Sequence, residues 1–454
     1  PHKCDDHGAG ETQDAGGRMP DIWQVNRSEH VHVAVEGDHE QRDPRVAYCE
    51  HCGHCQAGPG FFERLAWMVL AAGDCGNPFA RKVERDGKIV IEDISDLILE
   101  RIHAMHFDAL IIVGGDGTLH IANKLCKRGV PAVGVPKTID NDLNLPPYVD
   151  TFGFQTARHF GVDIVKNLMV DARTTSRWYL VIAMGRKAGH LALGIGKAAA
   201  ATLTLIPEEF TTKPIRMKEV VDTLVGAIVK RLSYGRSDGV AVIAEGLVLG
   251  IDPDDLKGLD QVECDPHGNV RIAEVDIGEV LRAAVNKRLA EFGLKMTLVA
   301  KNIGYELRCA DPIPLDMEYT RDLGYSAAKY LLSGGNAAMI SMQGGQFVPI
   351  PFGQLLDPET GRARVRLVDM HSTRYAIARR YMIRLRRDDF EDAHELAKIA
   401  ATAHVSLEKF RREFEYLVLD EPRPLVVSET DGFEEQPEAD VDAAAEAEAD
   451  SCQL

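Results

Sequence analysis

Hydrophobic positions alternate between two spacings along most of the chain. Residues 94–105 carry apolar side chains at helical spacing, and the apolar run at 109–113 has the length of a buried strand. The alternation continues, with helices predicted at residues 119–127, 156–171, 191–201, 217–232, 277–292 and 322–332, and strands at 130–135, 178–184, 203–206, 239–244, 296–302 and 337–342. Such strands, apolar almost throughout, predict parallel sheets covered by helices on both faces.

Both ends of the chain depart from this pattern. Residues 1–59 show no sustained period, and the apolar run at 61–72 predicts a helix. After Arg423 there is no lysine or arginine, and ten acidic residues of that tail account for ten of the net charge of −18. We expect this tail to be disordered. The remaining body is only mildly acidic, which argues against a general nucleic-acid binder.

Composition narrows the cellular setting. The chain has no apolar run of the roughly 18–20 residues that a membrane helix needs, and its start lacks a secretory pattern, so we expect a cytoplasmic protein. Most of the nine cysteines are isolated, with the exception of Cys49, Cys52 and Cys55 beside His51 and His54. That group lacks a fourth metal ligand at standard spacing, and we interpret it as a local accident rather than a zinc or cluster site.

The first chemical motif, GGDGT, follows the strand at 109–113. Gly114, Gly115 and Gly117 let the backbone approach phosphate groups, and the helix predicted at 119–127 presents free N–H groups to anions. Asp116 is a candidate Mg²⁺ ligand, since Mg²⁺ is usually bound by one or two carboxylates together with substrate phosphates. A tight strand-to-helix turn capped by an aspartate is the structural alternative.

The second motif, PKTIDND, follows the strand at 130–135 and is more specific. Thr138, Asp140 and Asp142 alternate, which allows their side chains to face one crevice at the strand end. An aspartate there can accept the proton of a substrate hydroxyl during phosphoryl transfer, and Lys137 can neutralise phosphate oxygens. A purely structural turn has little use for this set of side chains.

These two motifs, together with TFGFQTA at 151–157, MGRKAGH at 184–190, IAEG at 243–246 and GYELRCADPIPLDMEYTRDLG at 304–324, resemble the phosphofructokinase family in content and order. Lipid and NAD kinases share only GGDGT. The resemblance implies two Rossmann-like parallel-sheet domains with the active site in the cleft between them. It assigns the donor domain to residues 76–152 and 305–345, the fructose 6-phosphate domain to 153–304, a helical C-terminal extension to 346–423 and a disordered acidic tail to 424–454. Residues 1–75 replace the first strand and the glycine turn with which the family begins, and neither is recognisable in their sequence.

The resemblance also implies roles. Asp140 is similar to the base that deprotonates the C1 hydroxyl of fructose 6-phosphate, Asp116 to the Mg²⁺ ligand, and Thr138 to a residue at the transferring phosphoryl group. Asp142 resembles a residue that lines the same region. The chain is thereby expected to make fructose 1,6-bisphosphate in glycolysis, with Lys137 and Arg186 assisting the chemistry.

The sugar site is implied by a further set of positions. Met184, Gly185 and Arg186 match the family's MGR segment, Glu245 the acid that binds the sugar, and Arg308 the arginine at the 6-phosphate. Tyr305 stands where many bacterial members have histidine. Arg177 resembles an arginine that acts in a neighbouring subunit's site, which implies a homodimer or homotetramer. A cluster at 379–387, namely Arg379, Arg380, Arg384, Arg386 and Arg387, is expected to be a solvated or subunit-facing surface.

The phosphoryl donor is the open point. Pyrophosphate-dependent members typically carry a second aspartate where this chain has Gly117, and glycine leaves room for a nucleotide α-phosphate. Lys137 indicates the opposite donor, because pyrophosphate-dependent members carry PKTIDND. We favour ATP, with pyrophosphate as the alternative. A sugar-phosphate-binding homologue that lacks activity, owing to an aberrant or truncated N-terminus, is a third interpretation.

Overall fold

The computed structural model describes residues 66–71, 77–85, 88–257, 275–355, 357 and 364–421. Its chain divides into two compact units. Unit 1 contains the described residues up to Thr138 together with Leu143–Gly153 and Pro312–Arg364. Unit 2 contains Ile139–Asp142, Phe154–Asp311 and the described residues from Val365 onward. Each unit is built on a parallel sheet, so the predicted α/β class with a helical C-terminal region is confirmed.

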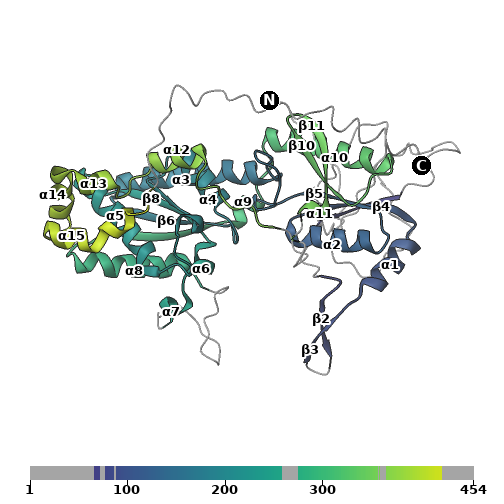
Figure 1. The fold of residues 1–454 in the computed structure, drawn as a ribbon, viewed down its shortest axis with the longest axis horizontal. Helices are drawn as coiled ribbons and strands as arrows, with labels where there is room; N and C mark the ends of the chain where they lie inside the picture. Colours follow the sequence, from purple (N-terminus) through teal and green to yellow (C-terminus); the bar gives the residue numbers. More distant parts are fainter. Residues whose placement is uncertain are drawn as a thin grey trace, which may run out of the picture. The chain divides into compact units, whose positions relative to one another are not determined.

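Unit 1 is a five-stranded sheet in the order β1-β4-β5-β10-β11, with helices on both faces (Figure 1). Strands β1, β4, β5 and β10 run parallel, and β11 closes the edge antiparallel to β10. Its elements are β1 (Ala66–Ala71), β2 (Arg81–Arg85), β3 (Lys88–Glu92), α1 (Ser95–Ala104), β4 (Phe107–Gly114), α2 (Asp116–Lys127), β5 (Ala132–Pro136), α10 (Pro314–Leu332), β10 (Ala338–Gln343), β11 (Gln346–Pro351) and α11 (Phe352–Leu355).

Strand β4 shows how one strand supplies both cores of unit 1. Leu110 and Ile112 pack in the cluster that contains residues of α1 and α2, whereas Ala109 and Ile111 pack in the cluster of α10. Successive side chains of a strand point to opposite faces, so a strand buried on both sides must be apolar throughout. This explains why the run at 109–113 has no alternation.

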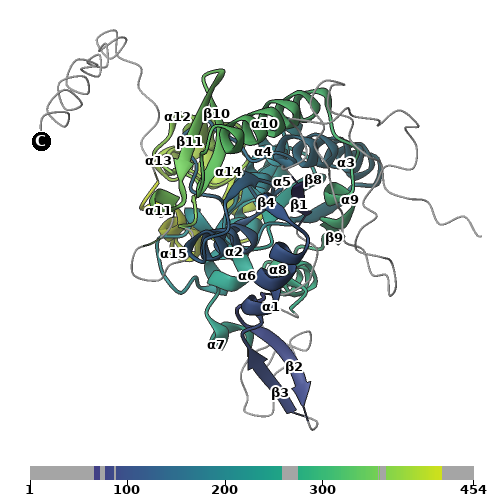
Figure 2. The same cartoon turned by 90° about the vertical axis from the view of Figure 1, so that its right-hand side faces the viewer.

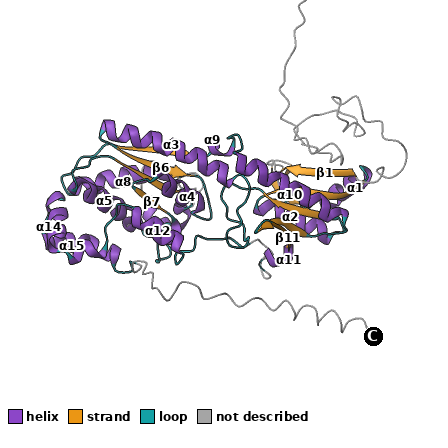
Figure 3. Ribbon diagram, turned by 90° about the horizontal axis from the view of Figure 1, so that it is seen from above, coloured by secondary structure: helices purple, strands orange, loops and turns teal. Residues whose placement is uncertain are grey.

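Unit 2 is a four-stranded, fully parallel sheet in the order β7-β8-β6-β9, again between helical layers (Figure 3). Leu180 packs with residues of α5 and α8, and its neighbour Val181 packs with residues of α3 and α4. The elements are α3 (Phe154–Thr175), β6 (Trp178–Ala183), α4 (His190–Ala199), β7 (Leu203–Leu205), α5 (Met217–Ser233), β8 (Gly239–Ala244), α6 (Leu247–Gly250), α7 (Pro253–Leu256), α8 (Ile277–Glu291), β9 (Leu298–Ile303) and α9 (Tyr305–Arg308).

The C-terminal helices belong to the core of unit 2. They are α12 (Thr373–Tyr381), α13 (Arg387–Glu391), α14 (Ala393–Thr402) and α15 (Leu407–Phe414). Phe410 and Phe414 are fully buried beside residues of α5 and α8. Buried ion pairs also connect the C-terminal region to earlier parts of unit 2: Lys230 on α5 donates to Asp389 across 2.7 Å, and Arg384 donates to Glu209 across 2.7 Å.

Several predictions at the edges of the sheets are wrong. The predicted helix at 61–72 contains strand β1, which pairs with β4, so an edge strand is present where we expected none. The predicted helical extension at 346–423 begins with strand β11 instead. Arg379 and Arg384, predicted on a surface, are buried. Residues 305–311, expected with the donor domain, belong to unit 2.

One structural feature was not predicted, and some predictions fall on residues that the structure does not describe. Strands β2 and β3 form a hairpin that extends from the rest of unit 1 in Figure 2, and no motif predicted it. The cysteines at 49–55, the residues after β1 and the acidic tail lie outside the described residues. Within the described part of the chain, every helix is too short or too polar to cross a lipid bilayer.

Candidate active site

In unit 1, the two predicted phosphate motifs lie side by side. Strands β4 and β5 are paired so that Gly114 is opposite Pro136, and the backbone N–H of Lys137 donates to the carbonyl of Gly114 across 2.9 Å. A Cβ added to Gly115 would lie 3.7 Å from the Cβ of Thr138. The strand register therefore brings the GGDGT turn and the start of PKTIDND together at the carboxyl ends of β4 and β5, as the sequence predicted.

Helix α2 begins at Asp116, with Gly115 as its N-cap. The first-turn N–H groups of a helix have no intrahelical partner and carry a partial positive charge, which suits phosphate oxygens. Gly114 is required for packing, because an added Cβ would lie 2.6 Å from the Cβ of Thr118. Gly117 is not, because an added Cβ there would meet nothing within 4 Å. Packing within the fold therefore does not require glycine at position 117, and a bound ligand could be what requires it.

Asp116 suits a Mg²⁺ ion that is shared with phosphates. Among the residues that the structure describes, no group of three or more His, Cys, Asp or Glu side chains is placed to hold a metal by itself. Mg²⁺ demands few protein carboxylates when substrate phosphates complete its octahedron. A single carboxylate at the start of a phosphate-binding helix meets that requirement. A site built entirely from protein ligands is not needed.

In unit 2, three candidate segments follow three neighbouring parallel strands. Ala183, the last residue of β6, is paired with Ala244 of β8 and with Ile303 of β9. The next residues, Met184-Gly185-Arg186, Glu245 and Gly304-Tyr305, therefore leave the sheet at one level and on one edge. The carboxyl edge of a parallel sheet is where α/β proteins bind ligands.

Backbone contacts hold these loops together. The N–H of Glu245 donates to the carbonyl of Ala183 across 2.9 Å, and the N–H of Gly185 donates to Oε2 of Glu245 across 3.4 Å. The N–H of Gly246 donates to the carbonyl of Gly185 across 2.9 Å. A Cβ on Gly246 would lie 2.6 Å from the carbonyl oxygen of Arg186, so glycine is needed for this close approach.

Asp140 lies among the charged groups of this edge. Its pKa is raised to about 6, mainly by burial and then by the negative charges of Asp142 and Glu245, and these effects outweigh the lowering by Arg308 and Arg186. All of these residues belong to unit 2. A carboxylate whose pKa approaches neutrality is suited to accept a proton near physiological pH. The structure thus groups Asp142, Arg186, Glu245 and Arg308 around Asp140 as charges that influence its carboxylate.

The remaining sugar-site candidates frame this group. Gly304 lies against Met184, since an added Cβ would come within 2.7 Å of its Cε. Arg308 ends the short helix α9 and is exposed, as is Tyr305, whose side chain is 77% exposed. Exposed groups of this kind are available to a phosphate that arrives from solvent.

Arg177 is placed apart from this group. It directly precedes β6, at the amino end of the strand whose carboxyl end leads to Arg186. Six residues of extended strand separate the two edges by roughly 20 Å, so Arg177 cannot serve the edge of its own unit. Its guanidinium instead lies 3.9 Å from Asp171.

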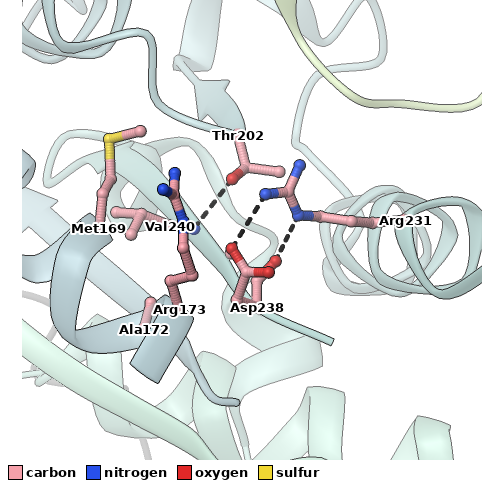
Figure 4. A pocket seen from close by; sticks show the side chains of 8 residues that line it. Met169, Ala172, Arg173, Thr202, Arg231, Asp238 and Val240 are labelled. Atoms are coloured by element: carbon pink, nitrogen blue, oxygen red, sulfur yellow. Dashed lines mark hydrogen bonds and ion pairs between the residues drawn. The ribbon is translucent and has the colours of Figure 1, made fainter. Parts of the chain in front are cut away.

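A small pocket also lies at the amino edge of unit 2 (Figure 4). Arg231 donates to Asp238 there across 3.0 Å, and the N–H of Val240 donates to Thr202 across 3.1 Å. Hydrogen bonds from Arg236, and then Arg231, lower the pKa of Asp238 to about 2. Its lining includes none of the candidate site residues, so it is separate from the carboxyl edge.

Arg366 is the residue of this edge that sequence reasoning missed. Its guanidinium donates to the carbonyl oxygen of Asn141 from Nε across 3.3 Å and from Nη2 across 3.1 Å. Its backbone N–H donates to the carbonyl of Asp142 across 2.8 Å. Arg366 stands 224 positions after Asp142 in a segment without a recognisable motif, so no local signal could have indicated the contact.

Comparisons with known proteins agree on one family. The family model for phosphofructokinase matches residues 77–331. The chain is 46% identical over 331 residues to pyrophosphate–fructose 6-phosphate 1-phosphotransferase of Thermotoga maritima, covering 71% of this chain and 79% of that protein. It is 45% identical to the enzyme of the same name from Naegleria fowleri, covering 72% and 77%. An ATP-dependent 6-phosphofructokinase 2 of Clostridium perfringens is 36% identical over 179 residues, covering 39% and 46%.

Proposed function

Because this chain belongs to the phosphofructokinase family, we propose that it transfers a phosphoryl group to the C1 hydroxyl of fructose 6-phosphate. The observation that carries the proposal is the group around Asp140, in which one aspartate of raised pKa is surrounded by two acids and two arginines. A general base near the operating pH and cationic groups for phosphate are the minimal equipment for this reaction.

In the proposed reaction, Asp140 accepts the C1 hydroxyl proton while the C1 oxygen forms a bond to the terminal phosphorus of the donor. The bridging bond of the donor breaks, and its electron pair leaves with the departing phosphate. Arg186 and Lys137 offset charge on the transferring group, and Thr138 contacts it. Glu245 accepts hydrogen bonds from sugar hydroxyls, with Met184 and Gly185 shaping the same loop.

Binding of the two substrates uses the remaining residues. Arg308 offers a planar guanidinium to the 6-phosphate, and Tyr305 offers a hydroxyl beside it. The N–H groups of Gly115, Gly117 and Thr118 bind donor phosphates, and Asp142 contributes to substrate binding. Mg²⁺, when bound through Asp116 and the donor, supplies positive charge to the phosphate oxygens.

We propose pyrophosphate as the donor. The two relatives that are 46% and 45% identical over most of their length carry pyrophosphate in their names. Lys137 supports the same donor. The sequence alone favours ATP, and the comparisons do not confirm that donor.

ATP remains a second candidate on one observation. Residue 117 is glycine although the fold would accept a side chain there, since an added Cβ meets nothing within 4 Å. Glycine in the first turn of a helix costs stability, and room for a nucleotide α-phosphate would offset that cost.

Arg177 bears on assembly. It lies at the sheet edge opposite Arg186, so a catalytic role requires a second copy of the chain. We propose a homo-oligomer in which Arg177 reaches the neighbouring subunit's sugar site. The proposed reaction belongs to glycolysis, and we propose that it takes place in the cytoplasm.

An assay with fructose 6-phosphate, Mg²⁺ and either pyrophosphate or ATP tests the proposal. We expect turnover with pyrophosphate, and a loss of about 10²–10⁴-fold in kcat for Asp140→Asn with sugar-phosphate binding retained. Asp163→Asn, an exposed carboxylate on α3, is the matched control. Binding of fructose 6-phosphate without turnover of either donor would instead support the non-catalytic interpretation.

A further inference from the structure

The turn that carries the proposed base is held by a residue from the far end of the chain. Asn141, between Asp140 and Asp142, has a φ of +55°, the left-handed conformation that asparagine tolerates better than most residues. Its side chain and that of Asp142 are both buried, and Ile139–Asp142 belong to unit 2. A short turn in this conformation needs tertiary contacts to keep two neighbouring carboxylates in place.

Arg366 makes those contacts. The guanidinium donates to the carbonyl oxygen of Asn141 and also to its Oδ1, and the backbone N–H of Arg366 donates to the carbonyl of Asp142. One residue thus binds two successive carbonyl groups and one side chain of the turn. The planar fork of arginine suits this pattern, and the single ammonium group of lysine cannot reproduce it.

The same residue is anchored to the loop of Arg186. The carbonyl oxygen of Arg366 lies 2.9 Å from Nε2 of His190, the last residue of MGRKAGH. Two positions further on, the N–H of Val368 donates to Glu208, whose carboxylate also accepts from the N–H of Gly189. The segment is therefore fixed to the MGRKAGH loop by its backbone, and to the Asp140 turn by the guanidinium and the backbone N–H of Arg366.

We propose that Arg366 is a positioning residue that holds the Asp140 turn in register with the loop of Arg186. The expected loss of kcat rests on the proposed function. The expected loosening of the Asp140 turn does not depend on that function. Arg366 lies outside residues 77–331, the part matched by the family model. The C-terminal segment therefore completes the catalytic edge rather than merely extending unit 2.

The test compares Arg366→Ala and Arg366→Lys with Arg364→Ala, a control that removes an exposed arginine two residues earlier. We expect Arg366→Ala to lower kcat about 100-fold, while KM for fructose 6-phosphate changes little, because a displacement of the base by about 1 Å has an effect of that order. Arg366→Lys should recover only part of the loss. Guanidinium chloride at millimolar concentration should restore activity to Arg366→Ala, and ammonium chloride should not.

Hydrogen exchange in the free protein supplies a readout independent of activity. Peptides that cover residues 139–145 should exchange faster in Arg366→Ala than in the wild type or Arg364→Ala, and guanidinium should restore their protection. If the wild type turns over and Arg366→Ala shows the same kcat and the same hydrogen exchange as the wild type, Arg366 has no positioning role. The proposed function would remain intact in that case. A wild type without turnover would remove the proposed function, and the exchange experiment would still decide the role of Arg366.

Discussion

The backbone N–H of Gly185 donates to Oε2 of Glu245 across 3.4 Å, which joins the loop after β6 to the acid after β8. Glu245 is also one of the charges that raise the pKa of Asp140. One carboxylate therefore both contacts the loop of Arg186 and contributes to the raised pKa of the proposed base. The two effects make separate predictions.

The first prediction concerns pH. Burial, followed by the charges of Asp142 and Glu245, raises the pKa of Asp140 to about 6 in the free protein, so kcat/KM should fall as the pH drops below that value and the base becomes protonated. Glu245→Gln removes one of the charges that raise the pKa of Asp140, so the acid limb of the pH–rate profile should move to lower pH. Glu100→Gln on α1 is the control. A limb that stays in place in Glu245→Gln would belong to another group, such as the donor phosphates.

The second prediction concerns stability. The pKa of Asp140 is about 6 in the folded protein, above the ordinary aspartate value of 3.8 that applies to the unfolded chain, so the folded state binds more protons between those pH values. The wild type should therefore lose free energy of unfolding as the pH rises through this window. Asp140→Asn removes the buried charge and should be more stable by about 1–3 kcal/mol at about pH 8, with a smaller difference below about pH 4. Urea unfolding at both pH values measures this, and a variant less stable than the wild type at the higher pH would contradict it.

The third prediction concerns close packing between the loops. In Gly246→Ala the new Cβ would lie 2.6 Å from the carbonyl oxygen of Arg186 and 2.9 Å from that of Gly185. Backbone must shift to relieve these contacts, so we expect a loss of about 1–3 kcal/mol in stability and at least about tenfold in kcat.

Gly324→Ala is the matched control for that substitution. An added Cβ at Gly324, inside helix α10, meets nothing within 4 Å. Alanine is the better helix former there, so this variant should gain about 0.5–1 kcal/mol with unchanged kinetics. Thermal unfolding and steady-state assays of both variants give the comparison, and equal behaviour of the two would refute the steric argument.

Periodicity predicted the centre of both sheets because a strand buried on two faces is recognisable by its apolar run. It failed at the edges. The sequence of β1, AWMVLA, is equally compatible with a buried helix, since an apolar run without alternation does not distinguish the two. Strand β11 contains Pro349 and Pro351, which argue against a central strand but are tolerated at the edge where β11 lies.

Residues of the candidate site could be predicted where they directly follow the carboxyl end of a strand in the sequence. Arg366 was not, because its contacts with Asn141 depend on the course of the C-terminal segment and not on local pattern. The prediction that Arg384 lies on a surface was wrong for the same reason. An arginine cluster in a helical region indicates a surface unless the partner is known, and Glu209 lies far earlier in the chain.

The fourth prediction concerns the donor. Gly117→Asp should fold normally, because an added Cβ meets nothing within 4 Å. A carboxylate at the start of α2 would obstruct and repel a nucleotide α-phosphate but leave pyrophosphate unaffected. If the wild type uses ATP at all, the variant should lose that activity selectively, by at least about tenfold in kcat/KM. Gly117→Ala is the control for bulk without charge. An equal loss with both donors would show that residue 117 does not discriminate between them.

The last prediction concerns assembly. Arg177 precedes β6 and Arg186 follows it, so one subunit cannot place both at one sugar site. Asp140→Asn and Arg177→Ala should each be inactive alone as homo-oligomers. In a mixed dimer, one site carries both substitutions and the other carries neither. Co-expression in equal amounts should therefore restore about a quarter of wild-type activity, since half of the dimers are mixed and half of their sites are intact. The control pairs Asp140→Asn with Glu245→Ala, two substitutions on the same edge, which should restore nothing. Failure of the first pair to complement, with mixed dimers verified by mass, would confine Arg177 to a structural role at the amino edge of unit 2.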